Sequence, residues 1–291
     1  MGIIMHKLST EINIKKQKRQ FDENVKISAI GSCFSEYISE KLQTYGLSVS
    51  SNPNGIVYNT SSILTGLTYI LNQKKYDDDN FIFHNELWHS WQHHGSFSNK
   101  VLIILKSKIS ETSGLFYNHL KKSDVLLLTP SSSVIYILKE KNLTISNCHK
   151  YPNNNFITNI LSKDDNLKNL LSITETIKSI NPKIKIIITL SPVRHYPGDL
   201  VLNSKSKANL LSAIHELITI HDDIEYFPSY EIMLDELRDY RFYNDDMLHP
   251  TTLAKEIILE RFVSSHFFDK TIELMQKKAK QNKFINHNKL S

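Results

Sequence analysis

The chain has 291 residues, of which 40% are hydrophobic and 22% charged, a composition that excludes an intrinsically disordered protein and allows one large domain. Lysine and arginine outnumber aspartate and glutamate by 35 to 30, and residues 277–289 alone hold five lysines and no acidic residue. The rest of the chain is therefore close to neutral, so the charge gives no support to a nucleic-acid-binding protein.

Cysteine content and hydropathy bear on where the protein works. Cys33 and Cys148 are the only cysteines, and the opening stretch MGIIMHKLSTEINIKKQ lacks the continuous apolar core of a secretory signal. No apolar run approaches the ~18 residues needed to cross a bilayer. We expect a cytoplasmic protein without a transmembrane segment, and the sequence carries no signal for an oligomeric state.

Apolar runs alternate with helical patterns along the chain. The first run, NVKISAIG at 24–31, leads into a helix with Phe34, Ile38 and Leu42 on one face, and Gly46 is its expected C-terminal cap. The later apolar runs lie at 123–130, 183–192 and 223–229, and helices are predicted over 108–122, 163–180, 203–221 and 251–280. Fully apolar strands that alternate with amphipathic helices predict an α/β protein, a three-layer α/β/α fold with a central parallel sheet.

Neither an internal repeat nor a linker rich in proline, glycine and serine divides the chain. We expect an N-terminal extension over residues 1–23 and a single domain over 24–265. Residues 266–291 then form a basic C-terminal helix or tail, which we expect to fray.

Small polar and reactive residues follow each apolar run. In open parallel sheets, ligands bind just beyond the carboxyl ends of the strands, so these residues are candidates for a site. Small polar residues also suit turns between strands and helices, and that alternative stays open for each set. The sets are Gly31-Ser32-Cys33, Thr129-Pro130-Ser131, Ser191-Pro192-Val193-Arg194-His195 and Pro228-Ser229-Tyr230.

Ser32 could act as a nucleophile if the fold supplies a base for its proton and a group that orients the base. Asp246 and His249, three residues apart and followed by Pro250, could supply both functions. In a turn, the carboxylate can hold one imidazole nitrogen while the other faces outward. This spacing also arises by chance, so it gains weight only beside Ser32 and the predicted fold.

Seven blocks of the sequence, taken in order, resemble the GSCFA domain family within the SGNH (GDSL-like) hydrolase superfamily. The similarity runs from about residue 26 to 262, and its blocks are GSCF, NPNGIVYN, LWHSWQHHGSFS, NCHKYPNNNF, SPVRH, NSKSKANL and YFPSYEIMLDELRDYRFYNDDMLHP. The resemblance implies a flavodoxin-like fold. It further implies a triad in which Ser32 attacks an ester carbonyl, His249 is the general base and Asp246 orients it. The chemistry implied is ester hydrolysis, including acetyl esters of carbohydrates, or acyl transfer to a sugar hydroxyl.

The chain departs from the superfamily pattern at the oxyanion hole. Superfamily members take one donor from an asparagine after a middle strand, where this chain reads Thr129-Pro130-Ser131-Ser132-Ser133. Gly55, Asn59 and Asn147, the last of these beside His149, are alternative donors. The backbone amides of Ser32 and Cys33 at a helix start are the safer physical candidates.

Cys33 is a rival to Ser32, because a thiol at a helix N-terminus can have a lowered pKa and attack as thiolate. Its alternative role is that of a small residue packed under the turn. Family position favours Ser32.

Two further groups could line a substrate pocket. Arg194 and His195 could bind a substrate anion, or Arg194 could pair with a neighbouring carboxylate. His94 lies in a block with His84, His89, His93, Trp88 and Trp91. That block could line an acyl or sugar pocket or simply pack, and no metal site is expected there, although His89 and His93 have a spacing that could bind zinc on a helix.

These observations favour a serine-dependent ester-processing enzyme, an esterase or an O-acyltransferase, acting on a small-molecule or glycan ester. No cofactor is expected, apart from acetyl-CoA as the acyl donor if the enzyme is a transferase. The alternative is a non-catalytic carbohydrate-binding or assembly protein that keeps the scaffold with an altered oxyanion hole.

Overall fold

A central sheet of five parallel strands organises the structure. The computed structural model describes residues 10–194 and 199–288, with side chains up to residue 282. The strands run in the order β10-β9-β5-β1-β2. They are β1 (Lys26–Gly31), β2 (Ser48–Ser51), β5 (Val125–Thr129), β9 (Lys185–Ile188) and β10 (Ile224–Tyr226). The strand order reverses at β1, so this doubly wound sheet has its switch point between β1 and β5.

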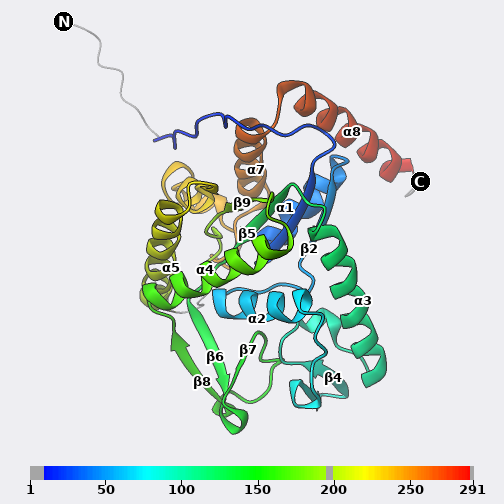
Figure 1. The fold of residues 1–291 in the computed structure, drawn as a ribbon. Helices are drawn as coiled ribbons and strands as arrows, with labels where there is room; N and C mark the ends of the chain where they lie inside the picture. Colours follow the sequence, from blue (N-terminus) through cyan, green and yellow to red (C-terminus); the bar gives the residue numbers. More distant parts are fainter. Residues whose placement is uncertain (1–9, 195–198, 289–291) are drawn as a thin grey trace, which may run out of the picture.

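Helices cover both faces of this sheet, which confirms the predicted α/β/α layers (Figure 1). On one face α1 (Cys33–Thr44) and α7 (Thr252–His266) bury an apolar stripe that includes Phe34, Leu42 and Phe262. The other face is covered by α2 (Thr60–Leu71), α3 (Leu102–Leu120), α4 (Lys163–Ile180) and α5 (Leu200–Ile220). A short helix, α6 (Ser229–Glu231), follows β10 and continues into a π-helical turn.

Two small antiparallel sheets, which the sequence did not predict, lie beyond α2 at the lower end of the molecule (Figure 1). One is the hairpin of β3 (Phe81–His84) and β4 (Leu87–Ser90), inserted between α2 and α3. The other, inserted between β5 and α4, contains β6 (Val134–Leu138), β7 (Leu143–Ile145) and β8 (Phe156–Ile160). Strands of three to five residues leave little periodicity to detect, because much of their stability comes from pairing with other segments.

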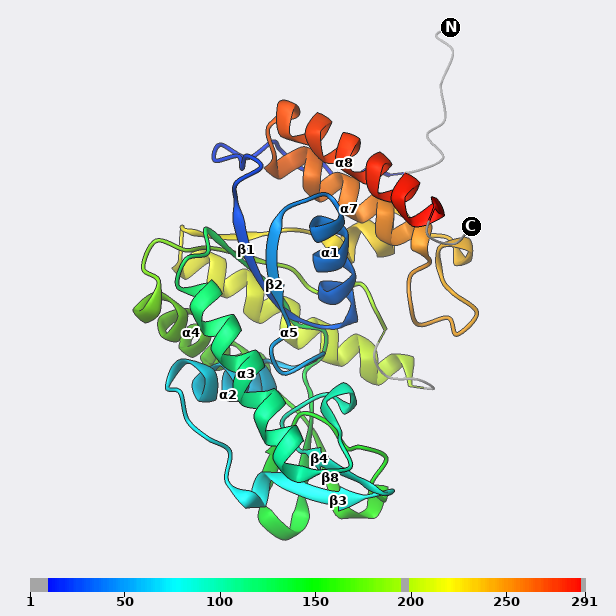
Figure 2. The same ribbon diagram turned by 90° about the vertical axis from the view of Figure 1, so that its right-hand side faces the viewer.

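The single helix predicted over 251–280 is wrong. Phe267 adopts extended backbone, with φ −113° and ψ 152°, and separates α7 from α8 (Asp269–Asn288). Its ring is fully buried and packs edge-on against Phe21. The expected fraying of the C-terminal segment stays a prediction. In the structure α8 reaches the C-terminal end of α1, where Asn282 Nδ2 donates to the Thr44 carbonyl at 2.7 Å (Figure 2).

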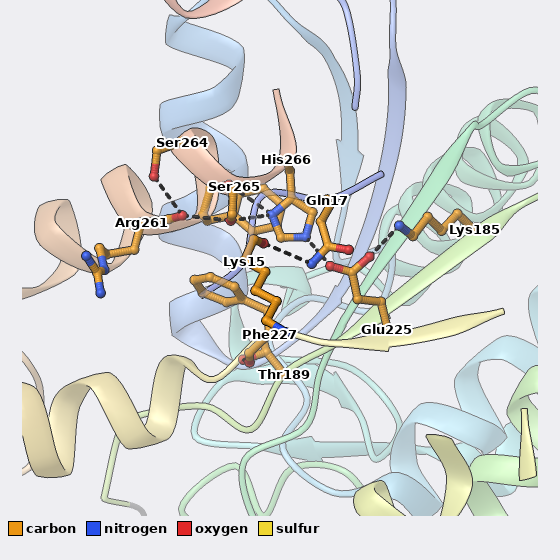
Figure 3. A network of polar contacts seen from close by, with 11 residues as sticks. Lys15, Gln17, Lys185, Thr189, Glu225, Phe227, Arg261, Ser264, Ser265 and His266 are labelled. Carbon is orange, nitrogen blue, oxygen red and sulfur yellow. Dashed lines mark hydrogen bonds and ion pairs between the residues drawn. The ribbon is translucent and has the colours of Figure 1, made fainter. Parts of the chain in front are cut away.

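A polar network ties α7 to the sheet and to the N-terminal segment (Figure 3). His266, 0% exposed, shares a 2.8 Å hydrogen bond through Nε2 with the Glu225 carboxylate, which also pairs with Lys185. The Gln17 amide donates to the Ser265 carbonyl at 2.8 Å. The described part of the expected N-terminal extension is therefore packed onto the domain.

The turn after β1 requires a glycine. Gly31 has φ +151°, and a Cβ built on it would lie 2.2 Å from the Thr129 carbonyl oxygen of the neighbouring strand β5. The Ser32 amide donates to that same oxygen at 3.1 Å. Only a residue without a side chain lets the two strand ends approach this closely.

We expect Gly31→Ala to lower the free energy of unfolding by about 3 kcal/mol, through the clash and the unfavourable φ. Urea unfolding followed by circular dichroism measures the change. The control is Gly114→Ala on the exposed face of α3, where a Cβ meets no neighbour, and there we expect a gain of up to about 1 kcal/mol. Equal stability of Gly31→Ala and the wild type would show that the strand ends do not constrain this position.

Candidate active site

Ser32 lies at the carboxyl end of β1 and is the N-cap of α1. Its hydroxyl oxygen accepts a hydrogen bond from the Phe34 amide at 3.3 Å. The residue is 0% exposed, so the predicted nucleophile is enclosed in this structure. The position at the sheet's switch point agrees with the prediction from the strand ends.

Asp246 and His249 lie side by side in the turn before α7, as the spacing predicts. Asp246 Oδ2 accepts a hydrogen bond from His249 Nδ1 at 2.6 Å. The other carboxylate oxygen accepts from the Leu248 and His249 amides at 2.9 and 3.0 Å. These amides and the imidazole lower the pKa of Asp246 to about 2, so the carboxylate is ionised at neutral pH. The arrangement leaves His249 Nε2 free of Asp246, and the imidazole is about half exposed.

Ser32 precedes α1, and the turn with Asp246 and His249 precedes α7, so both turns lie at the N-terminal ends of helices that cover the same face of the sheet. Lys255, in the first turn of α7, lies over the ring of Tyr37 in α1, with Nζ 4.4 Å from the ring centroid. A second connection runs through the strand ends, since the Ser191 amide donates to the Pro130 carbonyl and the Arg194 amide to the Leu248 carbonyl. Among the described residues, however, no hydrogen bond joins the Ser32 hydroxyl to the His249 imidazole.

Cys33 begins α1 and is partly buried against the core on the α1 side of the sheet. Burial raises the pKa of its thiol, and the neighbouring Phe34 and Cys33 backbone amides do not reverse this effect. A thiol of raised pKa is a poor nucleophile near neutral pH, so the rival interpretation, in which Cys33 attacks as thiolate, is not favoured at this helix start.

Gly55 and His94 meet close to α1. Gly55 has φ +73°, and a Cβ on it would lie 2.4 Å from the Cβ of His94. The Gly55 amide already donates to the Asn52 carbonyl at 2.8 Å, so it is not available as an oxyanion donor in this conformation. Burial raises the pKa of Glu36 in the first turn of α1, and the neighbouring His94 side chain opposes this rise.

The two candidate asparagines both use their side-chain oxygens in local structure. Asn59 caps α2 by accepting from the Ser62 amide at 2.8 Å. Asn147 accepts from the His149 amide at 2.9 Å, in the loop after β7. His149 is buried and bonds through Nε2 to the Ser90 carbonyl at 2.7 Å. Asn147 and His149 therefore lie beside the small antiparallel sheets. Asn59 lies nearer to the end of β5, because the carbonyl of the preceding residue, Tyr58, accepts from the Ser131 backbone amide.

Arg194 is held against the turn that carries His249. Its guanidinium stacks on Tyr243, 4.3 Å from the ring centroid, and donates to the Met247 carbonyl at 3.3 Å. Among the described residues Arg194 has no carboxylate partner. His195 lies outside the described residues.

The serines that replace the expected asparagine form a buried network. Ser133 donates its amide to Ser206 Oγ at 2.7 Å and its hydroxyl to the Ser206 carbonyl at 2.7 Å. Ser132 Oγ bonds to the same Ser206 hydroxyl, and Asn166 Nδ2 donates to Ser133 Oγ at 3.0 Å. The Ser131 hydroxyl is buried without a partner among the described residues. This loop is thus anchored to α4 and α5.

The histidine block is a hydrogen-bonded structural cluster. His89 lies in strand β4, not on a helix, and bonds to Ser98 Oγ and the His84 carbonyl. His93 is 0% exposed and bonds to Ser90 Oγ at 2.7 Å and to Asn54 Nδ2 at 3.1 Å. Within the described part of the chain, no three His, Cys, Asp or Glu side chains are grouped so as to hold a metal ion.

Sequence reasoning missed Lys207 of α5, which is only 2% exposed. Its Nζ donates to the Ser191 carbonyl at 2.7 Å, and burial lowers its pKa to about 7. The available signal was its place in the heptad-like spacing of the buried face, since Asn203, Leu210, Ile214 and Leu217 lie on the same side of the helix.

Asn52, at the end of β2, was missed as well. Its side-chain oxygen accepts from the Gly31 amide at 2.9 Å, next to Ser32. Its buried amide nitrogen has no partner among the described residues. The positive φ of 46° at this position favours asparagine.

The protein is a doubly wound α/β protein. It has a serine at the switch point of the sheet and an Asp-His pair just before a neighbouring helix. The chain belongs to the GSCFA family, whose model matches residues 26–262. Comparison with curated proteins by sequence gives no match.

Several solved structures have a similar fold. A carbohydrate esterase of family 3 from Talaromyces cellulolyticus is 10% identical, with a TM-score of 0.41, covering 87% of this chain and 99% of that one. A family 3 carbohydrate esterase from Clostridium thermocellum is 12% identical, with a TM-score of 0.39, and the shares covered are 88% and 99%. For a GDSL-like lipase from Bacteroides thetaiotaomicron the identity is 12%, the TM-score 0.41 and the shares 81% and 84%. Likenesses of this size carry no functional assignment.

No helix among the described residues is both long enough and apolar enough to span a bilayer.

The buried histidines predict a loss of stability in acid. Burial lowers the pKa of His93 to about 3 and that of His149 to about 4, from 6.5. Asn54 donates to His93 Nε2, so that nitrogen cannot accept a proton without losing its partner. Below pH 6.5 these two imidazoles bind protons in the unfolded chain but stay neutral in the folded chain. The free energy of unfolding therefore falls as the pH drops towards 4.

We expect the free energy of unfolding, measured with urea, to decrease between about pH 6.5 and about pH 5, where the carboxylates are still largely ionised. His149→Gln, which can still donate to the Ser90 carbonyl, should show a smaller decrease. Identical slopes in the wild type and in this variant would contradict the assignment of the acid sensitivity to His149.

Proposed function

We propose that the chain is a serine-dependent enzyme acting on ester bonds, with Ser32 as nucleophile, His249 as general base and Asp246 as the residue that orients His249. The observation that carries the proposal is the Asp246 carboxylate, which fixes both the imidazole and its backbone turn through three hydrogen bonds. A surface ion pair does not need this geometry, whereas a general base does, because its tautomer and direction must be set. Membership of the GSCFA family adds support.

The reaction follows from these groups. Ser32 Oγ attacks the acyl carbonyl carbon as its proton passes to His249 Nε2, and the ester bond breaks as the leaving alkoxide takes that proton. Asp246 stabilises the imidazolium formed in between. Water, or a sugar hydroxyl, then attacks the acyl-enzyme and gives its proton to His249. The bond between the acyl carbon and Ser32 Oγ breaks as His249 returns the proton to Oγ, which regenerates Ser32 and releases the acid or the new ester.

The proposed reaction needs an oxyanion hole, that is, a hydrogen-bond donor for the negative charge that develops on the carbonyl oxygen. The Ser32 amide is occupied by the Thr129 carbonyl, while the Cys33 amide lies at the first position of α1, where no carbonyl of the same helix can accept from it. We assign the Cys33 amide to the oxyanion. Since Ser32 is fully buried, an acyl carbon reaches it only when the site opens.

Hydrolase and O-acyltransferase share the first half of this reaction. The acceptor and the exclusion of water separate them. We propose a glycan or other small ester as substrate and, for the transferase, acetyl-CoA as donor. Intact-mass measurement after incubation with acetyl-CoA tests the donor, since one acetyl group added to the wild type and absent from Ser32→Ala identifies the acyl-enzyme.

Ser32→Ala and His249→Ala should each reduce the release of p-nitrophenol from p-nitrophenyl acetate by about 10³-fold or more, because either change removes the nucleophile or its base. Asp246→Asn should cost about 10²-fold or more. The matched control is Cys33→Ala, which should keep most of the activity. Equal rates for the wild type, Ser32→Ala and His249→Ala would refute the mechanism.

A second candidate is a non-catalytic carbohydrate-binding or assembly protein on the same scaffold. The enclosed Ser32 and the hydroxyls of Ser132 and Ser133, which are held in structural hydrogen bonds, favour it. A fluorophosphonate probe separates the two candidates, because it labels only an activated serine. We expect labelling at Ser32 of the wild type and none of His249→Ala. An unlabelled wild type that binds glycans in a calorimeter as tightly as Ser32→Ala does would establish the binding protein.

A further inference from the structure

Lys207 is a buried amine that the proposed reaction does not use. Its side chain extends from α5 to the carboxyl edge of the sheet, where Nζ donates to the Ser191 carbonyl at 2.7 Å. The centroid of the Tyr230 ring lies 5.5 Å from Nζ, and the Ser191 amide donates in turn to the Pro130 carbonyl in the loop after β5. Lys207 therefore lies at the same edge of the sheet as the Ser32 turn.

Lys207 has no ion-pair partner among the described residues. Taking an amine out of water is costly, and an apolar residue of similar volume would stabilise the fold at least as well. The general stability of α5 therefore does not explain a lysine at this position. What the lysine adds is a directed hydrogen bond to one backbone segment.

That segment, Ser191–Arg194, follows β9 along the chain and contacts the turn that carries His249. At its start, the Ser191 amide donates to the Pro130 carbonyl at 2.9 Å, next to the strand end that holds Ser32. At its other end, the Arg194 amide donates to the Leu248 carbonyl at 3.1 Å, and the guanidinium donates to the Met247 carbonyl. One backbone segment thus connects the loop after β5, where the Thr129 carbonyl accepts from the Ser32 amide, with the turn that carries His249.

We propose that Lys207 is a positioning residue, whose hydrogen bond to Ser191 fixes the Ser191–Arg194 segment and, through it, the direction of His249 towards the carboxyl edge of the sheet. Its effect on turnover rests on the proposed function, while its effect on the segment does not. Ser206, one residue earlier on α5, binds the Ser132–Ser133 loop. The same helical turn thereby fixes two adjacent loops at this edge.

Hydrogen exchange followed by mass spectrometry on the full chain tests the structural effect directly. In Lys207→Met we expect residues 189–194 and 244–250 to exchange about tenfold faster or more, with α3 and the β6-β7-β8 sheet unchanged. Lys207→Gln, which keeps a donor without the charge, should restore part of the protection. The matched control is Lys205→Met, an exposed lysine on the same helix, which should change neither segment.

Thermal unfolding shows whether the variants are folded. We expect the melting temperature of Lys207→Met to be no lower than that of the wild type, since the buried amine is removed. If Lys207→Met does not fold, Lys207→Gln alone decides, and wild-type exchange in both segments would overturn the proposal. Uniformly faster exchange throughout the molecule in either folded variant would overturn it as well.

Kinetics with p-nitrophenyl acetate test the functional consequence. A misdirected base should lower kcat about tenfold or more while KM changes less than about twofold, because positioning acts on the transition state. A wild type without turnover refutes the ester-processing function and leaves the exchange result standing. Normal exchange in the folded Lys207 variants of an active enzyme refutes the positioning role alone.

Discussion

The close contact between Gly31 and the Thr129 carbonyl is the constraint on which the site depends. Parallel strands β1 and β5 are paired up to this point, where the missing side chain lets the backbone turn directly into α1. Ser32 thereby becomes both the helix cap and the residue at the switch point of the sheet. A side chain at position 31 would push the two strand ends apart and displace the serine with them.

The second half of the candidate site depends on the Asp246 carboxylate, which accepts three hydrogen bonds. Asp246 accepts from two amides and one imidazole, so a single carboxylate couples the imidazole of His249 to the backbone of the turn before α7. Arg194 contacts this turn through its backbone amide, which donates to the Leu248 carbonyl, and through its guanidinium, which donates to the Met247 carbonyl. At the same edge of the sheet, Ser206 of α5 binds the hydroxyls of Ser132 and Ser133.

Two residues at the carboxyl edge of the sheet are buried from solvent. Ser32 and Lys207 are both enclosed, one with a neutral hydroxyl and the other with an amine whose pKa burial lowers to about 7. Enclosure strengthens electrostatic interactions within the site, because water no longer screens them. The same enclosure makes opening a necessary step of any reaction at Ser32.

The sequence by itself determined the α/β class, four of the five strands of the central sheet (β1, β5, β9 and β10) and the local pairing of Asp246 with His249, because these depend on periodicity and on spacing within one turn. The small antiparallel sheets and the break at Phe267 depend on contacts between distant segments, and the pattern of residues did not reveal them. The roles of Gly55, Asn59 and Asn147 could not be judged from residue type, since each has a backbone or side-chain partner that only the tertiary structure supplies. Lys207 shows the reason most clearly: on a linear chain it is one of many lysines, and only folding removes it from water and aims its single hydrogen bond at the segment beside His249.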